Sequence, residues 1–350
     1  MLLNGLAGRS CLLDTIISIP LDDNLVKAGP IGACFVYAGM TENLHRPAAS
    51  LNKFSMTAAR RTPIAGSMSQ DAPFNRRLRR LRRDRAARRF AEADYLHRLA
   101  ADDLIERLDF VKRDFRRALD LGCAGGYLTR RLRERGLEVT AFDAGSAFAR
   151  CAGGVQGDED RLPFADGAFD LVVSVGALDG VNDLPGALIL TRRALRPDGL
   201  FLGAFAGAGS LARLRRAMLA ADLVYDGAAP RIHPQIDVRA AGDLLTRAGF
   251  ALPVVDVQPV DVRYRSLMDL VRDLRAMGST NILAARSRRP LGRRALAAAI
   301  ADFDPAAGDK TTERFEIVHL LGWSPSPDQP RPAARGSGKV SLAEALKPPS

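Results

Sequence analysis

The stretch 118-ALDLGCAGGYL-128 decides the fold of this chain. In it an apolar run ends in an acid, and a glycine-rich turn leads into residues typical of a helix. Gly122 permits a sharp turn, while Gly125 and Gly126 let the backbone approach a ligand closely. The following helix would point its N-terminus at that ligand. The turn matches neither the P-loop pattern GxxxxGK[ST] nor the dinucleotide fingerprint GxGxxG, so it predicts a nucleotide-like ligand of another kind.

Around this turn, short apolar runs bounded by glycine alternate with helical segments. The pattern predicts strands at 117–122, 137–144, 153–158, 169–178 and 199–205, and helices at 127–136, 184–197 and 211–224. Farther along, it predicts helices near 238–250, 266–278 and 291–303, and strands near 254–264 and 315–323. Such alternation predicts βαβ units and a parallel sheet that helices cover on both faces.

Two further acids follow predicted strands. Asp143 ends the second strand, 17 residues after Gly126, where an acid can accept hydrogen bonds from both hydroxyls of a ribose. Asp158 follows the third strand, where an acid can accept a hydrogen bond from an adenine amino group. The segment LPF at 162–164 and the stretch 195-LRPDGLFLG-203 come next in order.

Together these elements resemble the class I S-adenosylmethionine-dependent methyltransferase family over about residues 115–205. The resemblance implies a Rossmann-like α/β fold, with a seven-stranded, mostly parallel sheet whose last strand is antiparallel, and S-adenosylmethionine as cofactor. It implies that Asp120 lies near the methionine amino group, Asp143 at the ribose and Asp158 at the adenine, with Gly122, Ala124, Gly126 and Ser174 as further cofactor-binding residues. The chain departs from the family at Ala124, where the turn usually has a glycine and where a β-carbon can crowd the cofactor.

Segments outside that core are similar to the mitochondrial complex I assembly factors described as arginine hydroxylases, and to their bacterial relatives. These segments are 74-FNRRLRR-80, 180-GVNDLPGAL-188, 229-APRIHP-234, 272-RDLRAMGSTN-281 and 321-LGWSPSPDQPRPAARGSGKVSL-342. The resemblance implies a protein substrate, an arginine of the complex I iron–sulfur subunit near the quinone site, modified by methylation or hydroxylation. Two alternatives stay open: an O-methyltransferase acting on malonyl carrier protein or another small acceptor, and a non-catalytic assembly chaperone.

Two residues of these segments are candidates for catalysis. The assembly factors resemble LHWVNDLP where this chain has 178-LDGVNDLP-185, so Asp179 is either a base at the acceptor or a solvated loop acid. His233, in Ile-His-Pro, is either an acceptor-site residue or a loop histidine bonded to backbone. The chain has four histidines and no HxD or HxE pair, which predicts no conventional iron site and no other metal site.

The stretch 74-FNRRLRRLRRDRAARRF-90 carries nine arginines and one acid. Its apolar residues Phe74, Leu78 and Leu81 fall at helical spacing. One interpretation is an electrostatic contact with an acidic partner, or with the membrane surface through Arg76–Arg89. The other is a solvated basic helix that packs its thin apolar edge on the domain. Nucleic acid is a weaker candidate, because aromatic residues stand only at the two ends.

The chain has 350 residues, of which 47% are hydrophobic, enough for one large or two ordinary domains. We expect a poorly ordered leader over 1–68 (with the true start at Met56 or Met68), a basic helical region over 69–110, a methyltransferase-fold domain with C-terminal helical insertions over 111–323 and an extended tail over 324–350. No stretch reaches the roughly 20 apolar residues of a membrane span, and the four cysteines form no CxxC pair. We therefore expect a cytoplasmic protein, with peripheral attachment at the inner face of the membrane as the alternative.

Overall fold

The computed structural model describes residues 25–26, 72–225, 227–304 and 309–329. Its strands are β1 (Leu25–Val26), β2 (Arg117–Leu121), β3 (Glu138–Asp143), β4 (Val155–Gln156), β5 (Phe169–Val175), β6 (Leu195–Ala206), β7 (Ala251–Tyr264) and β8 (Thr311–Trp323). Its helices are α1 (Arg76–Ala86), α2 (Tyr95–Asp109), α3 (Tyr127–Glu134), α4 (Ser146–Cys151), α5 (Leu184–Ala194), α6 (Ala212–Leu223), α7 (Val238–Arg247), α8 (Leu267–Ala276) and α9 (Arg293–Phe303). Short 3-10 helices lie at η1 (Phe90–Glu92) and η2 (Leu178–Gly180).

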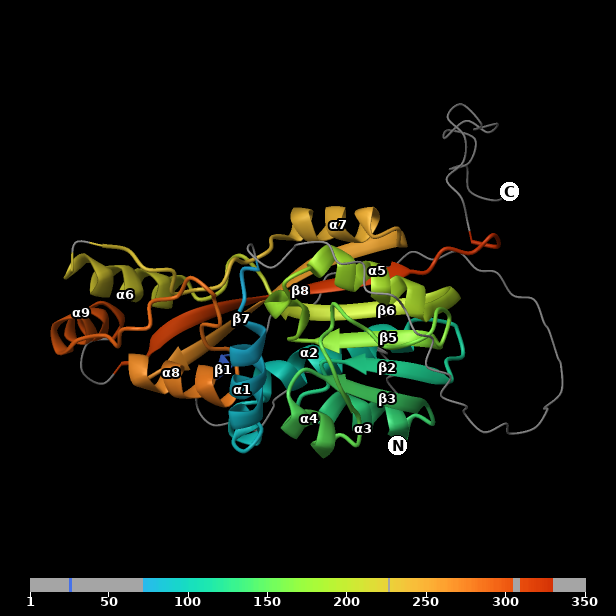
Figure 1. Cartoon of the computed structure of the whole chain (residues 1–350), viewed down its shortest axis with the longest axis horizontal. Coiled ribbons are helices and arrows are strands. Elements are labelled where there is room, and N and C mark those ends of the chain that lie inside the picture. The colour runs from blue at the N-terminus through green and yellow to red at the C-terminus, as the bar shows by residue number, and fades with distance from the viewer. Residues whose placement is uncertain (1–24, 27–71, 226, 305–308, 330–350) are drawn as a thin grey trace, which may run out of the picture.

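All the strands belong to one sheet, in the order β1-β7-β8-β6-β5-β2-β3-β4 (Figure 1). Strand β2 runs parallel to β3 and β5, and β5 runs parallel to β6. Strand β8 lies between β6 and β7 and is antiparallel to both. Apart from the two-residue β1, this is the seven-stranded sheet with an antiparallel last strand that the resemblance implied, so the fold prediction is confirmed.

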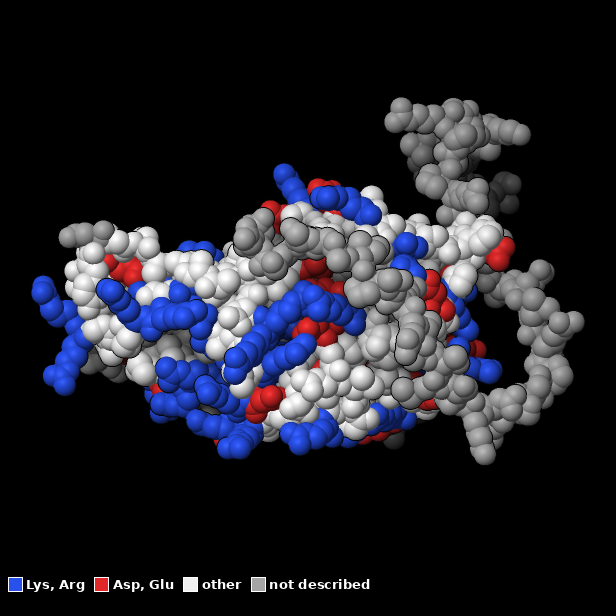
Figure 2. Space-filling view, in the orientation of Figure 1, with Lys and Arg blue, Asp and Glu red and all other residues white. Residues whose placement is uncertain are grey.

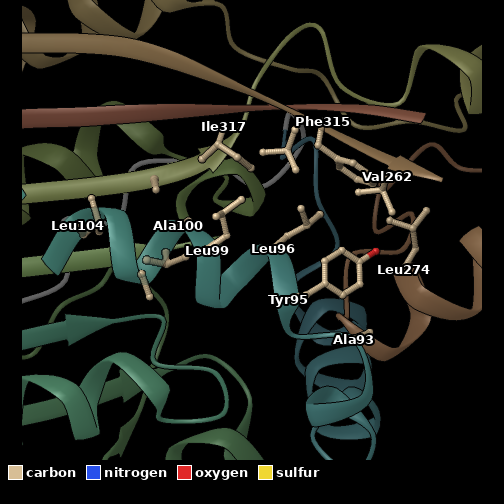
Figure 3. Close-up of a cluster of buried hydrophobic side chains, with 14 of the residues drawn as sticks. Ala93, Tyr95, Leu96, Leu99, Ala100, Leu104, Val262, Leu274, Phe315 and Ile317 are labelled. Carbon is tan, nitrogen blue, oxygen red and sulfur yellow. The ribbon is translucent and has the colours of Figure 1, made fainter. Parts of the chain in front are cut away.

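Hydrophobic clusters cover both faces of the sheet. One cluster joins α2, α3 and α8 to one face, and the other joins α5 and α7 to the opposite face. Neighbouring residues of β5 divide between them, with Val173 in the first cluster and Val172 in the second, as the pleat of a strand requires. Figure 3 shows the first cluster, where Leu99 of α2 lies beneath Ile317 of β8. Burying one such side chain stabilises the fold by about 1.5–3 kcal/mol.

Strands β7 and β8 form the longest pairing in the sheet. It runs from Ala251 opposite Trp323 to Tyr264 opposite Thr311. Helices α6, α8 and α9 gather around one end of this two-stranded extension (Figure 1), and α6 packs on α9. This C-terminal part supplies one wall of the pocket described below.

Local signals determine where several elements begin and end. Side chains cap the starts of three helices by accepting a backbone N–H at 2.8 Å: Asn75 at α1, Asp183 at α5 and Asp237 at α7. Each such cap contributes about 1 kcal/mol. Helix α5 was expected to reach Pro197, but it ends at Ala194 because Leu195 already pairs with Phe169 of β5.

The predicted leader, apart from β1, and the tail beyond Gln329 lie outside the described residues. The first residues of the tail pack on the start of β6. The backbone of Ser324 accepts from the N–H of Asp198 (3.0 Å) and donates to the carbonyl of Gly199 (2.8 Å). The side chain of Gln329 donates to Asp198 Oδ1 (2.9 Å). Within the described ranges, no helix combines the length and apolar composition needed to cross a bilayer.

Candidate cofactor and acceptor site

The glycine turn joins the end of β2 to the start of α3. Gly122 (φ 88°) and Gly126 (φ 75°) adopt the left-handed backbone conformation. A β-carbon on Gly122 would lie 2.2 Å from the β-carbon of Ala177, so both backbone and space require glycine there. Ala124 also has a positive φ of 44°, which costs an L-residue about 1–2 kcal/mol. Ala124 therefore keeps the backbone conformation of the glycine that it replaces.

Asp120 and Ser174 make hydrogen bonds to the residues on either side of this turn. Asp120 is buried, and its Oδ2 accepts a hydrogen bond from Thr129 Oγ1 at 2.5 Å. Burial raises the pKa of Asp120 to about 7, and the nearby charge of Asp143 acts in the same direction. The Ser174 hydroxyl donates to the carbonyl of Leu121 at 2.7 Å, which ties β5 to the turn. Both residues lie where the cofactor assignment placed them, and their contact with a cofactor stays a prediction.

Asp143, at the end of β3, has its carboxylate fully occupied. Oδ1 accepts from Arg83 Nε (2.7 Å) and from the Gly145 N–H (2.7 Å), while Oδ2 accepts from Arg83 Nη2 (2.5 Å) and from the Ala124 N–H (3.0 Å). A carboxylate has about four acceptor positions, and all of them are taken. Burial favours the neutral acid, but Arg83 and the two backbone donors outweigh it and lower the pKa of Asp143.

Arg83 belongs to a row of four arginines on α1 that bind acids at the end of β3 and in the loop after β4. Arg76 binds Asp160, Arg79 binds Glu159, Arg80 binds Asp158 and Arg83 binds Asp143, with shortest N–O distances of 2.5, 2.5, 2.6 and 2.5 Å. The four positions recur three and four residues apart, so they share one face of the helix. Asp143 and Asp158, the two acids assigned to the adenosine part of the cofactor, thus both pair with α1.

These ion pairs correct the interpretation of α1 as a solvated helix packing on an apolar edge. Phe74 is buried, but Leu81 is 44% exposed, whereas Arg79 and Arg83 are buried. The buried Glu159 accepts two hydrogen bonds from Arg79 (2.5 and 2.8 Å), which also donates to the Ala177 carbonyl (3.0 Å). Phe74 and Leu78 pack against Ile282 and Leu283, and the four acids bind the neighbouring arginines, so ion pairs as well as apolar contacts decide which face of α1 turns inward.

A pocket of about 350 Å³ opens beside the turn. Ala124 and Gly176 line its end at the cofactor turn. Apolar side chains from α2, α6, α8 and β8 form most of its wall, among them Leu96, Leu214, Met218, Leu274, Phe315 and Ile317. Polar side chains reach it from the loops that follow β5, α6 and α8. A ligand in this pocket would therefore lie next to the glycine turn, against a largely apolar wall.

Asp179 and His233, the two catalytic candidates, both line this pocket. Asp179 is half-buried, and its carboxylate makes no hydrogen bond or ion pair with any residue that the structure describes. His233 Nε2 accepts a hydrogen bond from the backbone N–H of Ile282 at 3.0 Å, so the ring joins two loops of the pocket wall. Burial lowers the pKa of His233, while the charge of Asp179 opposes that shift. The structure brings the two residues together, and their catalytic roles stay predictions.

His97 of α2 was not considered from the sequence, yet it lines the same pocket. Both of its ring nitrogens are buried and have no hydrogen-bond partner among the described residues. Burial, followed by the charge of Arg83, lowers its pKa to about 4, so the ring is neutral at pH 7. A buried polar group without a partner costs about 1–3 kcal/mol, which makes His97 a candidate for contact with a bound ligand.

The arginine partners of the acids were also missed from the sequence. The signal was present in two parts, the three-and-four spacing of arginines in 76–83 and the acid run 158-DED-160. Nothing local joins them, because the partners lie 60 to 84 residues apart. Within the described part of the chain, no group of three or more histidine, cysteine, aspartate or glutamate side chains is arranged to hold a metal ion.

Comparisons with known proteins agree with this geometry. Residues 119–203 match the family model described as a methyltransferase domain. The arginine-hydroxylase NDUFAF5 of Danio rerio is 34% identical over 291 residues, covering 78% of this chain and 89% of the relative. The human NDUFAF5 is 35% identical, covering 77% and 82%. The malonyl-[acyl-carrier protein] O-methyltransferase of Laribacter hongkongensis is 34% identical, covering 73% and 90%.

Among solved structures, the YcgJ protein of Bacillus subtilis resembles this chain with a TM-score of 0.47 and 15% identity, covering 66% of this chain and all of that one. The relatives are similar enough, and covered fully enough, to show the family. The chain belongs to the class I S-adenosylmethionine-dependent methyltransferase family, is an enzyme of that family and has S-adenosylmethionine as its cofactor.

The glycine turn fits this cofactor as it stands, whereas the carboxylate of Asp143 fits it only after a change of partners. At the turn, Gly125 is exposed and Ala124 lines the adjoining pocket, on which the orphaned ring nitrogens of His97 also lie. At Asp143, every acceptor position is already filled. The ribose can bind there only when Arg83 withdraws, because the other two donors are backbone N–H groups of the turn and loop.

Proposed function

We propose that this enzyme modifies an arginine side chain of a protein, the iron–sulfur subunit of respiratory complex I near its quinone site. Two supports come from the comparisons: relatives named arginine-hydroxylase cover most of the chain, and its segments outside the cofactor core resemble the assembly factors of complex I. The observation that carries the proposal is the unpaired carboxylate of Asp179 on the wall of the acceptor pocket, a feature of this chain at a position where it departs from the LHWVNDLP of the assembly factors.

The charges around the pocket favour a cationic ligand. Two arginines line it, but Arg83 is paired with Asp143 and Arg231 with Asp222. Asp179 is then the uncompensated charge among the described residues of the wall. A guanidinium would neutralise it with up to two parallel hydrogen bonds, and the apolar wall suits the methylene stem of the same side chain.

Each part of the chain then has a defined task. S-adenosylmethionine, when bound, supplies a methyl group to the acceptor. Asp179 orients the guanidinium, and the apolar wall excludes water, which strengthens that ion pair. The hydrogen bond from Ile282 to His233 holds the two loops that frame the pocket. Methyl transfer to the guanidinium begins from this placement of the side chain. Hydroxylation would begin from the same placement and would need in addition an oxidant, such as dioxygen with a reductant, that the cofactor does not supply.

The second candidate is O-methylation of a malonyl carrier protein, which the relative from Laribacter hongkongensis supports. The acceptor named there is a carboxylate. Asp179 would repel it, and both arginines that line the pocket already hold aspartates. The pocket therefore favours the arginine acceptor.

Mass spectrometry of the complex I iron–sulfur subunit, from cells with and without this protein, tests the proposal. An oxygen-sized mass on one arginine that disappears with the deletion supports hydroxylation, and a methyl-sized mass that disappears supports methylation. An unchanged subunit contradicts the proposal and favours the carrier-protein acceptor.

Complementation with two variants connects the result to the pocket. Asp179→Asn should fail to restore the modification, whereas Glu134→Gln, which removes an exposed carboxylate on α3, should restore it. The proposal also keeps the enzyme in the cytoplasm, at or near the inner face of the membrane, and cell fractionation tests that location.

A further inference from the structure

A second set of arginines, Arg82 and Arg85 of α1 and Arg89 just after the helix, does not bind the acids that hold Arg76, Arg79, Arg80 and Arg83. With Arg275 of α8 they line a groove of about 520 Å³ between α1 and α8, which we name the arginine groove. Figure 2 shows basic side chains gathered over α8 and the adjoining end of α1.

The positive charge of this groove is largely uncompensated. The side chains of Arg85 and Arg275 are exposed and make no hydrogen bond or ion pair with the described residues. Arg82 donates to the carbonyl of Asn281, and Arg89 pairs with Glu92. Burial, and then repulsion from Arg286, Arg85 and Arg275, lowers the pKa of Arg82. The groove therefore presents a concentrated positive field to solvent.

The arginine groove adjoins the acceptor pocket. Val271, Thr280 and Asn281 line both of them. The wall at this junction is held in place, because the Asn281 amide donates to the carbonyl of Pro230 at 2.8 Å. A chain lying in the groove would thus pass beside the acceptor pocket.

We propose that the arginine groove binds an acidic segment of the protein substrate, next to the residue that enters the acceptor pocket. The inference rests on the proposed function in one respect, that the substrate is a protein. The positive groove attracts the acidic segment, and the wall that groove and pocket share places the residue to be modified next to the pocket. The concave shape between two helices suits an extended peptide better than the flat surface of a bilayer.

The test measures binding of a fluorescently labelled peptide, Glu-Glu-Ala-Arg-Ala-Glu-Glu, by anisotropy, without turnover. The test variant is Arg85→Gln/Arg275→Gln. The matched control is Arg77→Gln/Arg88→Gln, which removes the same charge from exposed arginines in and just after α1 that do not line the groove. We expect the test variant to weaken binding about tenfold and the control less than about twofold. The difference should shrink as salt rises from about 0.05 M to about 0.5 M.

Two results would overturn the inference. If both double variants weaken the peptide equally, net charge and not the groove binds it. If the wild type binds phosphatidylglycerol vesicles through Arg85 and Arg275 but not the peptide, the groove is a membrane-contact surface. Loss of peptide binding in the test variant, together with an unmodified complex I subunit in cells, would support the groove while contradicting the proposed function.

Discussion

Arg83 and Asp143 form a buried, two-bonded ion pair at the acid that the family resemblance assigns to the ribose of the cofactor. Their side chains are 9% and 0% exposed, and Arg83 Nη2 lies 2.5 Å from Asp143 Oδ2. Because the backbone of Ala124 and Gly145 takes the remaining acceptor positions, Arg83 and the ribose hydroxyls compete for one carboxylate. Helix α1 therefore covers Asp143 and Asp158, the two acids that the resemblance assigns to the adenosine part of the cofactor.

The first prediction concerns this competition. Replacing Arg83 with methionine frees two acceptor positions on Asp143, so we expect Arg83→Met to bind S-adenosylmethionine about tenfold more tightly, a gain of about 1.4 kcal/mol. Isothermal titration calorimetry measures it, with Arg88→Met as the control on an exposed position of the same segment. Weaker binding by Arg83→Met would show that Arg83 stays on Asp143 when the cofactor binds.

The second prediction concerns the pair of Arg79 and Glu159. Arg79→Ala leaves a fully buried carboxylate without its partner, which should lower the free energy of unfolding by about 3–5 kcal/mol. Exchanging both partners for apolar residues, as in Arg79→Met/Glu159→Leu, should restore most of that loss. Urea unfolding measures both variants, and Arg77→Ala, on the exposed face, should stay within about 0.5 kcal/mol of wild type. A loss of less than 1 kcal/mol in Arg79→Ala would contradict the pairing.

The third prediction concerns His97. Its folded pKa of about 4 lies below the ordinary value of 6.5, so the folded protein binds fewer protons there than the unfolded chain. Stability is therefore lost as the pH falls from 6.5 towards 4. His97→Phe should remove this loss and raise the free energy of unfolding at pH 5 by about 1–2 kcal/mol.

The same variant separates a structural role of His97 from a ligand contact. If the orphaned ring nitrogens receive the cofactor or the acceptor, His97→Phe should be more stable and yet bind S-adenosylmethionine more weakly. Calorimetry at pH 7.5 measures the affinity. Unchanged affinity would assign His97 to packing alone.

The fourth prediction concerns Asp120, whose pKa is raised from 3.8 to about 7 in the folded protein. A raised acid contributes stability that is complete below its unfolded pKa and is lost as the pH rises through its folded pKa. We expect Asp120→Asn to flatten the decline of stability between about pH 4 and pH 7. Denaturant unfolding across this range checks it, and an unchanged slope would show that Asp120 is ionised throughout.

Asp120 also makes cofactor affinity depend on pH. The ammonium group assigned next to it favours the ionised acid, so binding should release a proton and tighten as the pH rises through about 7. Titration calorimetry in buffers of different ionisation enthalpy measures that proton directly. Asp120→Asn should release none.

The order of strands and helices was largely available from the sequence. The alternation of short apolar runs with helical segments placed β2, β3, β5, β7 and β8 within a few residues, because burial on a sheet leaves a local, periodic pattern. The ends of elements were less certain, as the early stop of α5 at Ala194 shows. Helix α4, a single short turn of six residues, left no period long enough to identify.

The candidate site, too, could be predicted from the sequence in one part and not in another. Asp120, Asp143 and Asp158 could be placed at the site because the end of a parallel strand is a local feature, and all such ends meet at one edge of the sheet. The acceptor pocket could not be placed, because its wall joins α2, the loop after β5, the loop after α6, α8 and β8. No local pattern records which of these segments meet.

By itself, the sequence determined the fold family, the glycine turn, the three acids and the arginine-rich helix of this protein. The tertiary structure alone decided what the arginines do. Arg79, Arg82 and Arg77 are chemically equal in the sequence, yet one is buried on Glu159, one faces the arginine groove and one is exposed. A charged side chain is buried only where the fold brings an opposite charge to it, and that partner lies 80 residues away for Arg79.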